Sequence, residues 1–506
     1  MEAKKLLTIA LTGLLAGGCL MVPALAEDAD GQSSGNPATY TIPARVKRIE
    51  DYAFAGDTTL ERVKIPDGVT EIGDYAFSGC TNLQEIELPD GLTKIGNHAF
   101  DGCTALVRLG DMNQLESIGE YAFSGCEALE SIGDMPKLQT IGNYAFAEQT
   151  VTDEDSGTST TVSCKSLKTV GNLDSVTRIG SEAFSGCREL ESIGALPNVT
   201  RIAFGAFRNC EKLKKVEGLG KLTAINRNTF TGCTSLKSIG NLPKVTSIGE
   251  RAFRGCSALT SVGDLSNVTS IGNSAFSGCS ALASVGNLSN VTSIGDSAFA
   301  GCASLESIGN LQNVKSIGES AFGLYGYYDE NDKYQIIYCT SLKSIGDMPK
   351  LETIGASAFS CCSSLASVGD LSSVTSIGEY AFDGCSLLVS VGDLSSVTSI
   401  GNSAFSGCSS LASIGDLPNV TSIGDSVFYN CSSLASIGDL PNVTSIGEWA
   451  FSGCSSLASI GDLRSVTEIG NYAFYECPSL TLRVLPNSYA EDYAKSNSIP
   501  YTYIED

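Results

Sequence analysis

Residues 271–282 read Ile-Gly-Asn-Ser-Ala-Phe-Ser-Gly-Cys-Ser-Ala-Leu, and variants of this stretch return about every 23 residues along the 506-residue chain. The phenylalanine marks the period best: 18 of the 19 phenylalanines fall in one column, and only Phe204 lies outside it. A repeat of this length is typical of a solenoid, whose turns bury a shared core only by stacking on their neighbours. The sequence therefore predicts a solenoid of ~18 turns over residues 40–480.

Within each repeat the apolar residues recur three positions apart, which matches neither the helical period of about 3.6 nor the strand period of 2. Short parallel β-strands separated by tight bends fit this spacing, with glycines at the bends. The Ala-Phe-x-Gly-Cys stretch is expected to form a short helical turn that places its phenylalanine in the core. One repeat shows the pattern through Leu129, Ile132, Met135, Leu138 and Ile141, with bends at Gly133 and Gly142.

Seventeen of the 19 cysteines occupy one position of the repeat, three residues after the phenylalanine in uninterrupted repeats. Stacked turns about 4.8 Å apart leave disulfides between neighbouring turns geometrically possible. The number is odd, however, and small residues surround the position, so we predict buried free thiols that act as small apolar side chains. Cys361, beside Cys362, is read as a replacement for the usual glycine. The chain has no CxxC pair and one histidine, so we predict no metal site and no cofactor.

The two ends of the chain differ from the repeats. Residues 1–26 read as a secretory signal, with Lys4 and Lys5 before an apolar run and a small-residue site for cleavage after Ala26. A lipoprotein box acylated at Cys19 is the alternative, but it has Ala16 where leucine is usual. Residues 27–39 are a flexible polar leader, and no later stretch is apolar enough to insert in a membrane. Residues 481–506 are expected to form a cap with a helix at 488–497 and a strand at 501–504.

Residues 65–80, Ile-Pro-Asp-Gly-Val-Thr-Glu-Ile-Gly-Asp-Tyr-Ala-Phe-Ser-Gly-Cys, resemble the BspA-type bacterial leucine-rich repeat. The resemblance covers residues from about 40 to 480. Most repeats depart from the family's Ile-x-Leu-Pro strand ending, which is kept at residues 86–89, and use Ile-Gly-Asp-Leu. The resemblance implies a leucine-rich-repeat-like solenoid that is secreted or displayed on the cell surface. It also implies adhesion, because some members of the family bind host proteins or other microbes.

Insertions interrupt two repeats, at about residues 147–163 and 323–338. Both fall between the phenylalanine and the cysteine, so we expect both loops on the same face of the solenoid. The first is rich in Thr, Ser and Asp and is typical of a disordered loop. The second is either a recognition loop or a hairpin whose tyrosines pack on the solenoid. Its five tyrosines are Tyr325, Tyr327, Tyr328, Tyr334 and Tyr338.

Two further columns have candidate roles. Aromatic residues in consecutive N-terminal turns form a stripe that either stacks for stability or binds a protein or glycan. Aspartates after the Ile-Gly bend recur in six C-terminal turns, where they either cap nearby amides or share calcium; asparagines in the same column favour capping. The stripe is Tyr52, Tyr75, His98, Tyr121 and Tyr144, and the aspartates are Asp347, Asp370, Asp393, Asp416, Asp439 and Asp462.

The formal net charge of −24 argues against nucleic acids and anionic membranes as partners, and the acidic excess is larger in the C-terminal half. His98 is the only histidine and lies in a column that tolerates aromatics, so we expect no enzyme. We therefore predict a secreted or cell-surface binding protein for a protein or glycan ligand at the cell exterior. The alternative is a structural component of the envelope or matrix that self-associates.

Overall fold

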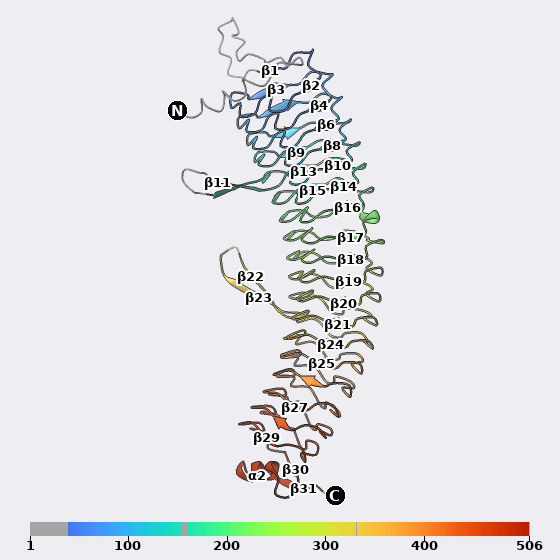
Figure 1. Ribbon diagram of the computed structural model, residues 1–506, viewed down its shortest axis with the longest axis vertical. Helices are drawn as coiled ribbons and strands as arrows, with labels where there is room; N and C mark the ends of the chain where they lie inside the picture. Colours follow the sequence, from blue (N-terminus) through green and yellow to red (C-terminus); the bar gives the residue numbers. More distant parts are fainter. Residues whose placement is uncertain (1–38, 153–158, 330, 505–506) are drawn as a thin grey trace. The chain divides into compact units, whose positions relative to one another are not determined.

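The computed structural model describes residues 39–152, 159–329 and 331–504, which belong to one compact unit beginning at Thr39. The signal sequence, Cys19 and nearly all of the polar leader lie outside the described residues. Within the unit the turns follow one another in chain order, from blue to red in Figure 1. Each regular turn contributes to two faces, which we call face A and face B.

Face A begins as a sheet of seven parallel strands. These are β1 (Thr39–Thr41), β3 (Arg62–Lys64), β5 (Glu85–Glu87), β7 (Arg108–Leu109), β9 (Ser131–Ile132), β13 (Thr169–Val170) and β15 (Ser192–Ile193). Beyond β15 only isolated parallel bridges remain on this face, such as Ser344 to Ser367.

Face B continues along the whole stack as parallel sheets of seven, eight and three strands, one strand for each phenylalanine of the column. The first sheet holds β2 (Arg48–Ile49), β4 (Glu71–Ile72), β6 (Lys94–Ile95), β8 (Ser117–Ile118), β10 (Thr140–Ile141), β14 (Arg178–Ile179) and β16 (Arg201–Ile202). The second holds β17 (Ala224–Ile225), β18 (Ser247–Ile248), β19 (Ser270–Ile271), β20 (Ser293–Ile294), β21 (Ser316–Ile317), β24 (Thr353–Ile354), β25 (Ser376–Ile377) and β26 (Ser399–Ile400). The third holds β27 (Ser422–Ile423), β28 (Ser445–Ile446) and β29 (Glu468–Ile469).

The strand register confirms the solenoid. Ile72 pairs with Ile95, one repeat further on, and Ile141 pairs with Ile179 across the first insertion, so the extra residues leave the stack in register. Between the faces the phenylalanine rings form a continuous pile, with neighbouring centroids 5.0–5.6 Å apart. From Phe77 to Phe451 these rings have no accessible surface or almost none. This pile is the centre of the core.

The Ala-Phe-x-Gly-Cys stretch forms single hydrogen-bonded turns that do not join into a helix. The Ser78 amide donates to the Tyr75 carbonyl, and the Cys80 amide donates to the Phe77 carbonyl. The amides of Tyr75, Phe77 and Gly79 donate instead to the following turn. Tyr75 and Gly79 have φ of 57° and 73°, which a right-handed helix does not permit. These left-handed residues direct alternate amides out of the turn and into the stack.

All 17 cysteines of the column are free, and 16 of them are buried, which confirms the prediction of a thiol column. Each thiol donates a hydrogen bond to the carbonyl of the phenylalanine in the preceding turn, as Cys279 does to Phe253 at 3.2 Å. Burial raises the pKa of the column thiols from Cys103 onward, for Cys339 to about 12. They therefore act as neutral donors that link turns. Cys361 occupies the glycine position of its turn with φ 59°.

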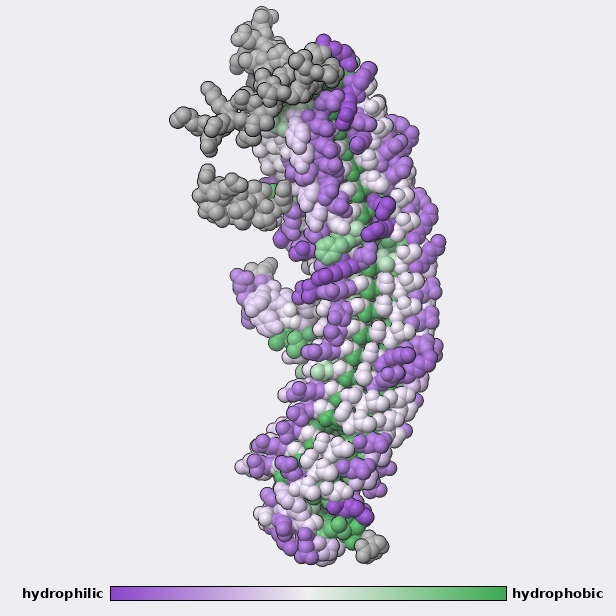
Figure 2. Space-filling view, viewed as in Figure 1, coloured by the Kyte–Doolittle hydropathy of each residue, from purple (hydrophilic) through white to green (hydrophobic). Residues whose placement is uncertain are grey.

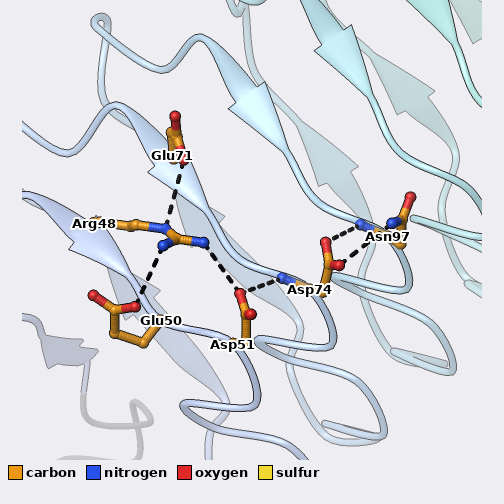
Figure 3. Close-up of polar contacts among 6 residues, drawn as sticks. All are labelled: Arg48, Glu50, Asp51, Glu71, Asp74 and Asn97. Atoms are coloured by element: carbon orange, nitrogen blue, oxygen red, sulfur yellow. Dashed lines mark hydrogen bonds and ion pairs between the residues drawn. The ribbon is translucent and has the colours of Figure 1, made fainter. Parts of the chain in front are cut away.

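A glycine follows most face B strands and brings successive turns into close contact. A Cβ atom added at Gly96 would lie 2.6 Å from the carbonyl carbon of Gly73. The next residue supplies a side-chain bond between turns. Asp51 accepts the amide N–H of Asp74, and Asp74 accepts that of Asn97, at 3.0 and 2.8 Å (Figure 3). In Figure 3 Arg48 also pairs with Glu50, Asp51 and Glu71.

Face B is interrupted twice, and the sequence shows why. Between β16 and β17 the close-contact glycine is replaced by Ala203 and then Asn226, and the two strands do not pair. The Asn226 side-chain amide donates to the Ile202 carbonyl, where regular turns use the backbone amide. Each interruption also precedes a turn with a β-branched residue in an otherwise alanine column, Thr229 and Val427. Thr229 and Val427 are larger than the usual alanine and need more space between neighbouring turns, which is consistent with the loss of strand pairing there.

The expected cap is present. It contains β30 (Leu482–Val484), α2 (Tyr489–Ser496) and β31 (Tyr501–Tyr503), and β30 pairs with β31 in parallel. Ser488 caps α2 by accepting the Glu491 amide. The Glu491 carboxylate, almost fully buried, is bonded to Lys495, to the Tyr503 hydroxyl and to the Asn487 amide. These contacts, led by Lys495, lower the pKa of Glu491 to about 2.

Both insertions contain antiparallel hairpins that leave the same side of the stack in Figure 1, as expected from their position in the repeat. The first pairs β11 (Gln149–Thr152) with β12 (Ser159–Val162), so the expectation of a disordered loop is wrong for these segments. Both strands contain Thr and Val, which favour β-strands despite the otherwise polar composition. The second pairs β22 (Tyr325–Tyr328) with β23 (Tyr334–Ile337).

Candidate binding surfaces

The hairpin of β22 and β23, called here the tyrosine hairpin, folds back over turns that precede it in the chain. Its first tyrosine, Tyr325, lies on a track of glycines, one from each turn. A Cβ added at Gly301 or Gly278 would collide with Tyr325, and one at Gly255 would lie 3.8 Å from its hydroxyl. The Arg254 guanidinium lies 5.6 Å from the centre of the same ring. Tyr325 therefore anchors the hairpin to the solenoid, as the packing interpretation of the tyrosines predicted.

A cleft of about 730 Å³ lies between the far part of the tyrosine hairpin and the solenoid. This volume is within the range of small-ligand sites. The solenoid side comes from the position after the cysteine in three successive turns, and the other side comes from the hairpin. The lining residues are Arg188, Glu211 and Thr234 on the solenoid, and Tyr327, Tyr328, Asp329 and Asn331 on the hairpin.

The charges in the cleft are partly paired. Arg188 forms an ion pair with Glu211 at 2.8 Å. The Asp329 carboxylate accepts the amides of Asn331 and Lys333, and its second oxygen accepts the side chain of Gln335. These bonds, the Lys333 amide first, lower the pKa of Asp329. The aspartate thus shapes the hairpin tip, leaving the tyrosines as the exposed groups at the mouth of the cleft.

Three tyrosines of the hairpin face solvent. Tyr327, Tyr328 and Tyr334 keep 37%, 69% and 51% of their accessible surface, and the rings of Tyr328 and Tyr334 are in contact at 5.2 Å. Tyr338 is half-buried at the base of the hairpin. Leu324 and Ile336 are also exposed on this insertion, whereas most of the surface in Figure 2 is hydrophilic. The exposed tyrosines form the largest aromatic group on either insertion among the described residues.

The N-terminal stripe is a stacked ladder. Neighbouring ring centroids from Tyr52 through Tyr75, His98 and Tyr121 to Tyr144 lie 4.5–4.8 Å apart, within 11° of parallel. His98 lies between two tyrosine rings, and its Nδ1 lies 2.9 Å from Asp101. All five residues have left-handed backbones, with φ of 53–60°. Because each inner ring is covered on both faces by its neighbours, the ladder offers edges rather than open faces, which favours the stacking interpretation.

The aspartate column behaves as caps. Asp370, Asp393 and Asp462 each accept the amide two residues ahead, and Asp416 accepts the amide of Asp439 in the next turn. These contacts satisfy bend amides that would otherwise be unpaired. In the part of the chain that the structure describes, no group of three or more His, Cys, Asp or Glu residues is arranged to hold a metal ion.

Sequence reasoning found the tyrosines but missed the solenoid side of the cleft. Arg188, Glu211 and Thr234 belong to turns about 90–140 residues before the hairpin, and nothing local indicates which way the hairpin folds. One signal was available in the charges. Residues 161–256 carry 15 basic and seven acidic residues, whereas the whole chain has a formal net charge of −24, and the hairpin tip contains Asp329 and Asp332. Attraction between the acidic hairpin tip and this basic part of the solenoid favours a hairpin that folds back towards the preceding turns.

Taken together, the repeat, the parallel faces and the phenylalanine pile define a leucine-rich-repeat solenoid. The model of the BspA type leucine rich repeat region (6 copies) matches residues 33–152, 157–283, 248–389, 330–458 and 389–499. The chain therefore belongs to this family. No curated protein matches it. None of the helices in the described part of the chain is long and apolar enough to cross a bilayer.

Solved structures of similar proteins come from several bacteria. A leucine-rich repeat protein from Bacteroides ovatus is 26% identical over 94% of each chain, with a TM-score of 0.39. A leucine rich cell surface protein from Faecalibacterium prausnitzii is 23% identical over 92% of this chain and 91% of its own, with a TM-score of 0.34. A leucine-rich repeat protein of T. pallidum is 32% identical over 35% of this chain and 77% of its own, with a TM-score of 0.31.

Proposed function

We propose that this protein is an exported, non-catalytic binding protein that attaches to a protein or glycan at the cell exterior through the tyrosine hairpin and the cleft beneath it. The observation that carries the proposal is the exposed group of Tyr327, Tyr328 and Tyr334, of which the first two line that cleft. Tyrosine is favoured at recognition surfaces because it offers a large contact area with few rotatable bonds.

Family membership and the anchoring of the hairpin give further support. Tyr325 on the glycine track and Arg254 over its ring fix the base of the hairpin, so less conformational entropy is lost when a ligand binds. The charge of −24 favours a partner that is neutral or carries basic groups over nucleic acid or an anionic membrane.

The proposal is tested by binding of the purified mature chain to immobilised extracellular-matrix proteins and glycans. In one variant, residues 323–338 are replaced by Ser-Gly, which restores the uninterrupted repeat as it stands at Ser277 and Gly278. We expect a ligand whose binding is lost in this variant while the far-UV circular dichroism of the solenoid is kept.

The matched control replaces residues 147–163 in the same way and should keep the binding. A finer variant, Tyr327→Ser with Tyr328→Ser and Tyr334→Ser, should lose it with the hairpin intact. If the folded protein binds no ligand and instead forms oligomers in light scattering, the structural alternative replaces this proposal.

A further inference from the structure

A second group of aromatic side chains lies in the last two turns before the cap. It contains Trp449, the single tryptophan of the chain, together with Tyr472 and Tyr475. Trp449 and Tyr472 stack with centroids 4.5 Å apart and planes 21° apart. Tyr475 stands edge-on to both, 6.1 Å from Trp449 and 5.9 Å from Tyr472. The two nearly equal distances place Tyr475 beside the stacked pair, at the height of the gap between the rings.

The last ring of this stack is largely exposed, as is Tyr52 at the end of the N-terminal ladder. Tyr472 is the last residue of its column, so no further ring of the column covers its outer face. Among the aromatic rings of the described residues, it contacts Trp449 and Tyr475. Tyr472 and Tyr475 keep 55% and 51% of their accessible surface. The outer face of the Tyr472 ring is therefore open, and the Tyr475 ring borders it at a right angle. We call this site the aromatic corner.

Stability alone does not require these residues. The column of Trp449 and Tyr472 has a left-handed backbone, with φ of 57° and 58°, which is unfavourable for bulky side chains. The two preceding turns have Ser403 and Ser426 at this position. The fold therefore accepts a small polar residue at this position, and the aromatic side chains of the last two turns form an exposed stacked pair that the backbone does not require.

The polar groups around the three aromatic residues limit the class of ligand that this site can bind. The indole N–H of Trp449 donates to the Glu448 carboxylate at 3.1 Å, and Glu476 follows Tyr475 directly. Carboxylates accept hydrogen bonds from hydroxyl groups and repel anions. Residues 257–506 contain seven basic residues, and two of those near the C-terminal end, Arg464 and Lys495, are already paired with Asp462 and Glu491, which disfavours an acidic ligand. A ligand with one apolar face and many hydroxyl donors fits this corner.

We propose that Trp449, Tyr472 and Tyr475 form a binding site for neutral carbohydrate, in which a pyranose ring stacks on the open face of Tyr472 and its hydroxyls donate to Glu448 or Glu476. The site is separate from the tyrosine hairpin and does not depend on it. Its place on the last turns allows a polysaccharide chain to run past the end of the solenoid.

The single tryptophan makes the test direct, because all indole fluorescence of the protein comes from this site. The full-length mature protein is titrated with laminarin, yeast mannan and xylan as neutral polysaccharides, and with polygalacturonate as the acidic one. We expect a saturable change in the intensity or wavelength of emission with at least one neutral polymer and none with polygalacturonate.

Tyr472→Ser introduces the residue that this column has at Ser403 and Ser426, so the fold should tolerate it, and it keeps the tryptophan reporter. We expect this variant to lose about tenfold or more in affinity, as truncation of a central aromatic contact does. Tyr380→Ser, which removes an exposed tyrosine of the same column far from the site, is the matched control and should bind as the parent does. The variant lacking the tyrosine hairpin should also bind as the parent does, which separates this site from the proposed adhesive one.

Three results would overturn the proposal. The first is no fluorescence response to any of the neutral polymers in folded protein. The second is a response to polygalacturonate alone. The third is unchanged affinity in a double variant, Tyr472→Ser with Tyr475→Ser, confirmed by affinity electrophoresis in gels containing the polymer.

Discussion

The N-terminal turns, residues 39–202, and the middle turns, residues 224–317, share a core but differ on face A. In the N-terminal turns face A is a seven-stranded sheet with ion pairs between turns, such as Arg62 with Glu85. In the middle turns from Ser238 to Ser307 no bridge joins face A of one described turn to the next. Face B and the phenylalanine pile run through both. Single backbone hydrogen bonds still join these turns on face A, such as that from the Thr260 amide to the Lys237 carbonyl at 3.2 Å. The comparison indicates that the core and face B hold the turns together, whereas full strand pairing on face A is not needed.

The largest effect should come from the pile itself. Phe276→Ala in a middle turn and Phe100→Ala in an N-terminal turn should each lower the free energy of unfolding by about 4 kcal/mol, because each leaves a cavity between stacked rings. Urea denaturation followed by circular dichroism measures this. Phe204→Ala, outside the column, is the control and should cost about 1 kcal/mol or less. A far smaller loss at Phe276 than at Phe100 would show that the face A sheet strengthens the N-terminal core.

The next largest effect should come from the close-contact glycines of face B. In Gly295→Ala the new Cβ would lie 2.6 Å from the Asn273 amide nitrogen, so two turns must separate, at a cost of about 3 kcal/mol. Gly415→Ala, on face A with open space around it and φ of 76°, should cost about 1 kcal/mol for its left-handed backbone alone. The midpoint of urea unfolding compares them. Equal losses would contradict the assignment of close packing to face B.

A smaller effect should separate the aromatic ladder from isolated members of its column. Tyr121 stacks on His98 and Tyr144, whereas Tyr380 lies between turns that have serine at this position. Replacement by serine should therefore cost about 2 kcal/mol more at Tyr121 than at Tyr380, since Tyr121 loses two stacked pairs that each contribute about 1 kcal/mol. Thermal unfolding measures the difference. Equal costs would indicate that stacking does not stabilise the ladder and would reopen a binding role for it.

Acid should open the cap before it affects the turns. Glu491 has its pKa lowered to about 2 from an ordinary 4.5, so its contribution to stability is present above pH 4.5 and is lost as the pH falls from 4.5 towards 2. Cleavage of the C-terminal segment by pepsin, followed by mass spectrometry, should increase through this range. In Glu491→Gln the carboxylate charge is absent, and the cleavage rate should depend less on pH. A cap equally resistant at pH 2.5 and pH 5 would contradict this assignment.

The smallest effect involves no change in overall stability. The amide of Gly171 donates across turns to Ile132 at 3.0 Å, whereas the corresponding Gly286 amide has no cross-turn partner in the described chain. Hydrogen–deuterium exchange should therefore be faster in the peptide around Gly286 than in that around Gly171. Similar protection at both glycines would remove the difference between the two regions.

Much of this molecule could be predicted from one repeat. The period predicted the solenoid, the Phe and Cys columns predicted the buried pile and the thiols, and the insertion points predicted loops on one face. The cleft under the tyrosine hairpin could not be predicted in full. Its solenoid side, from Arg188 to Thr234, depends on the direction in which the hairpin folds, and a regular surface offers many equivalent places for it to lie.

The sequence by itself determined the period, the core and the close contacts of face B, because a glycine column without Cβ atoms is the one arrangement that lets backbones approach so closely. Tertiary structure decided the pairing on face A. Residues 367–373 and 390–396 have the same sequence, Ser-Val-Gly-Asp-Leu-Ser-Ser, yet Gly392 is left-handed with φ of 72° and Gly369 is not.

The same holds for Gly415 and Gly438, which lie in identical stretches and differ in the same way. From Ser238 onward, bridges are missing on face A where two successive bend glycines are both left-handed, as at Gly263 and Gly286. Glycine adopts either conformation at similar energy. The local sequence therefore does not determine which backbone conformation a bend glycine adopts, and contacts with the neighbouring turns do.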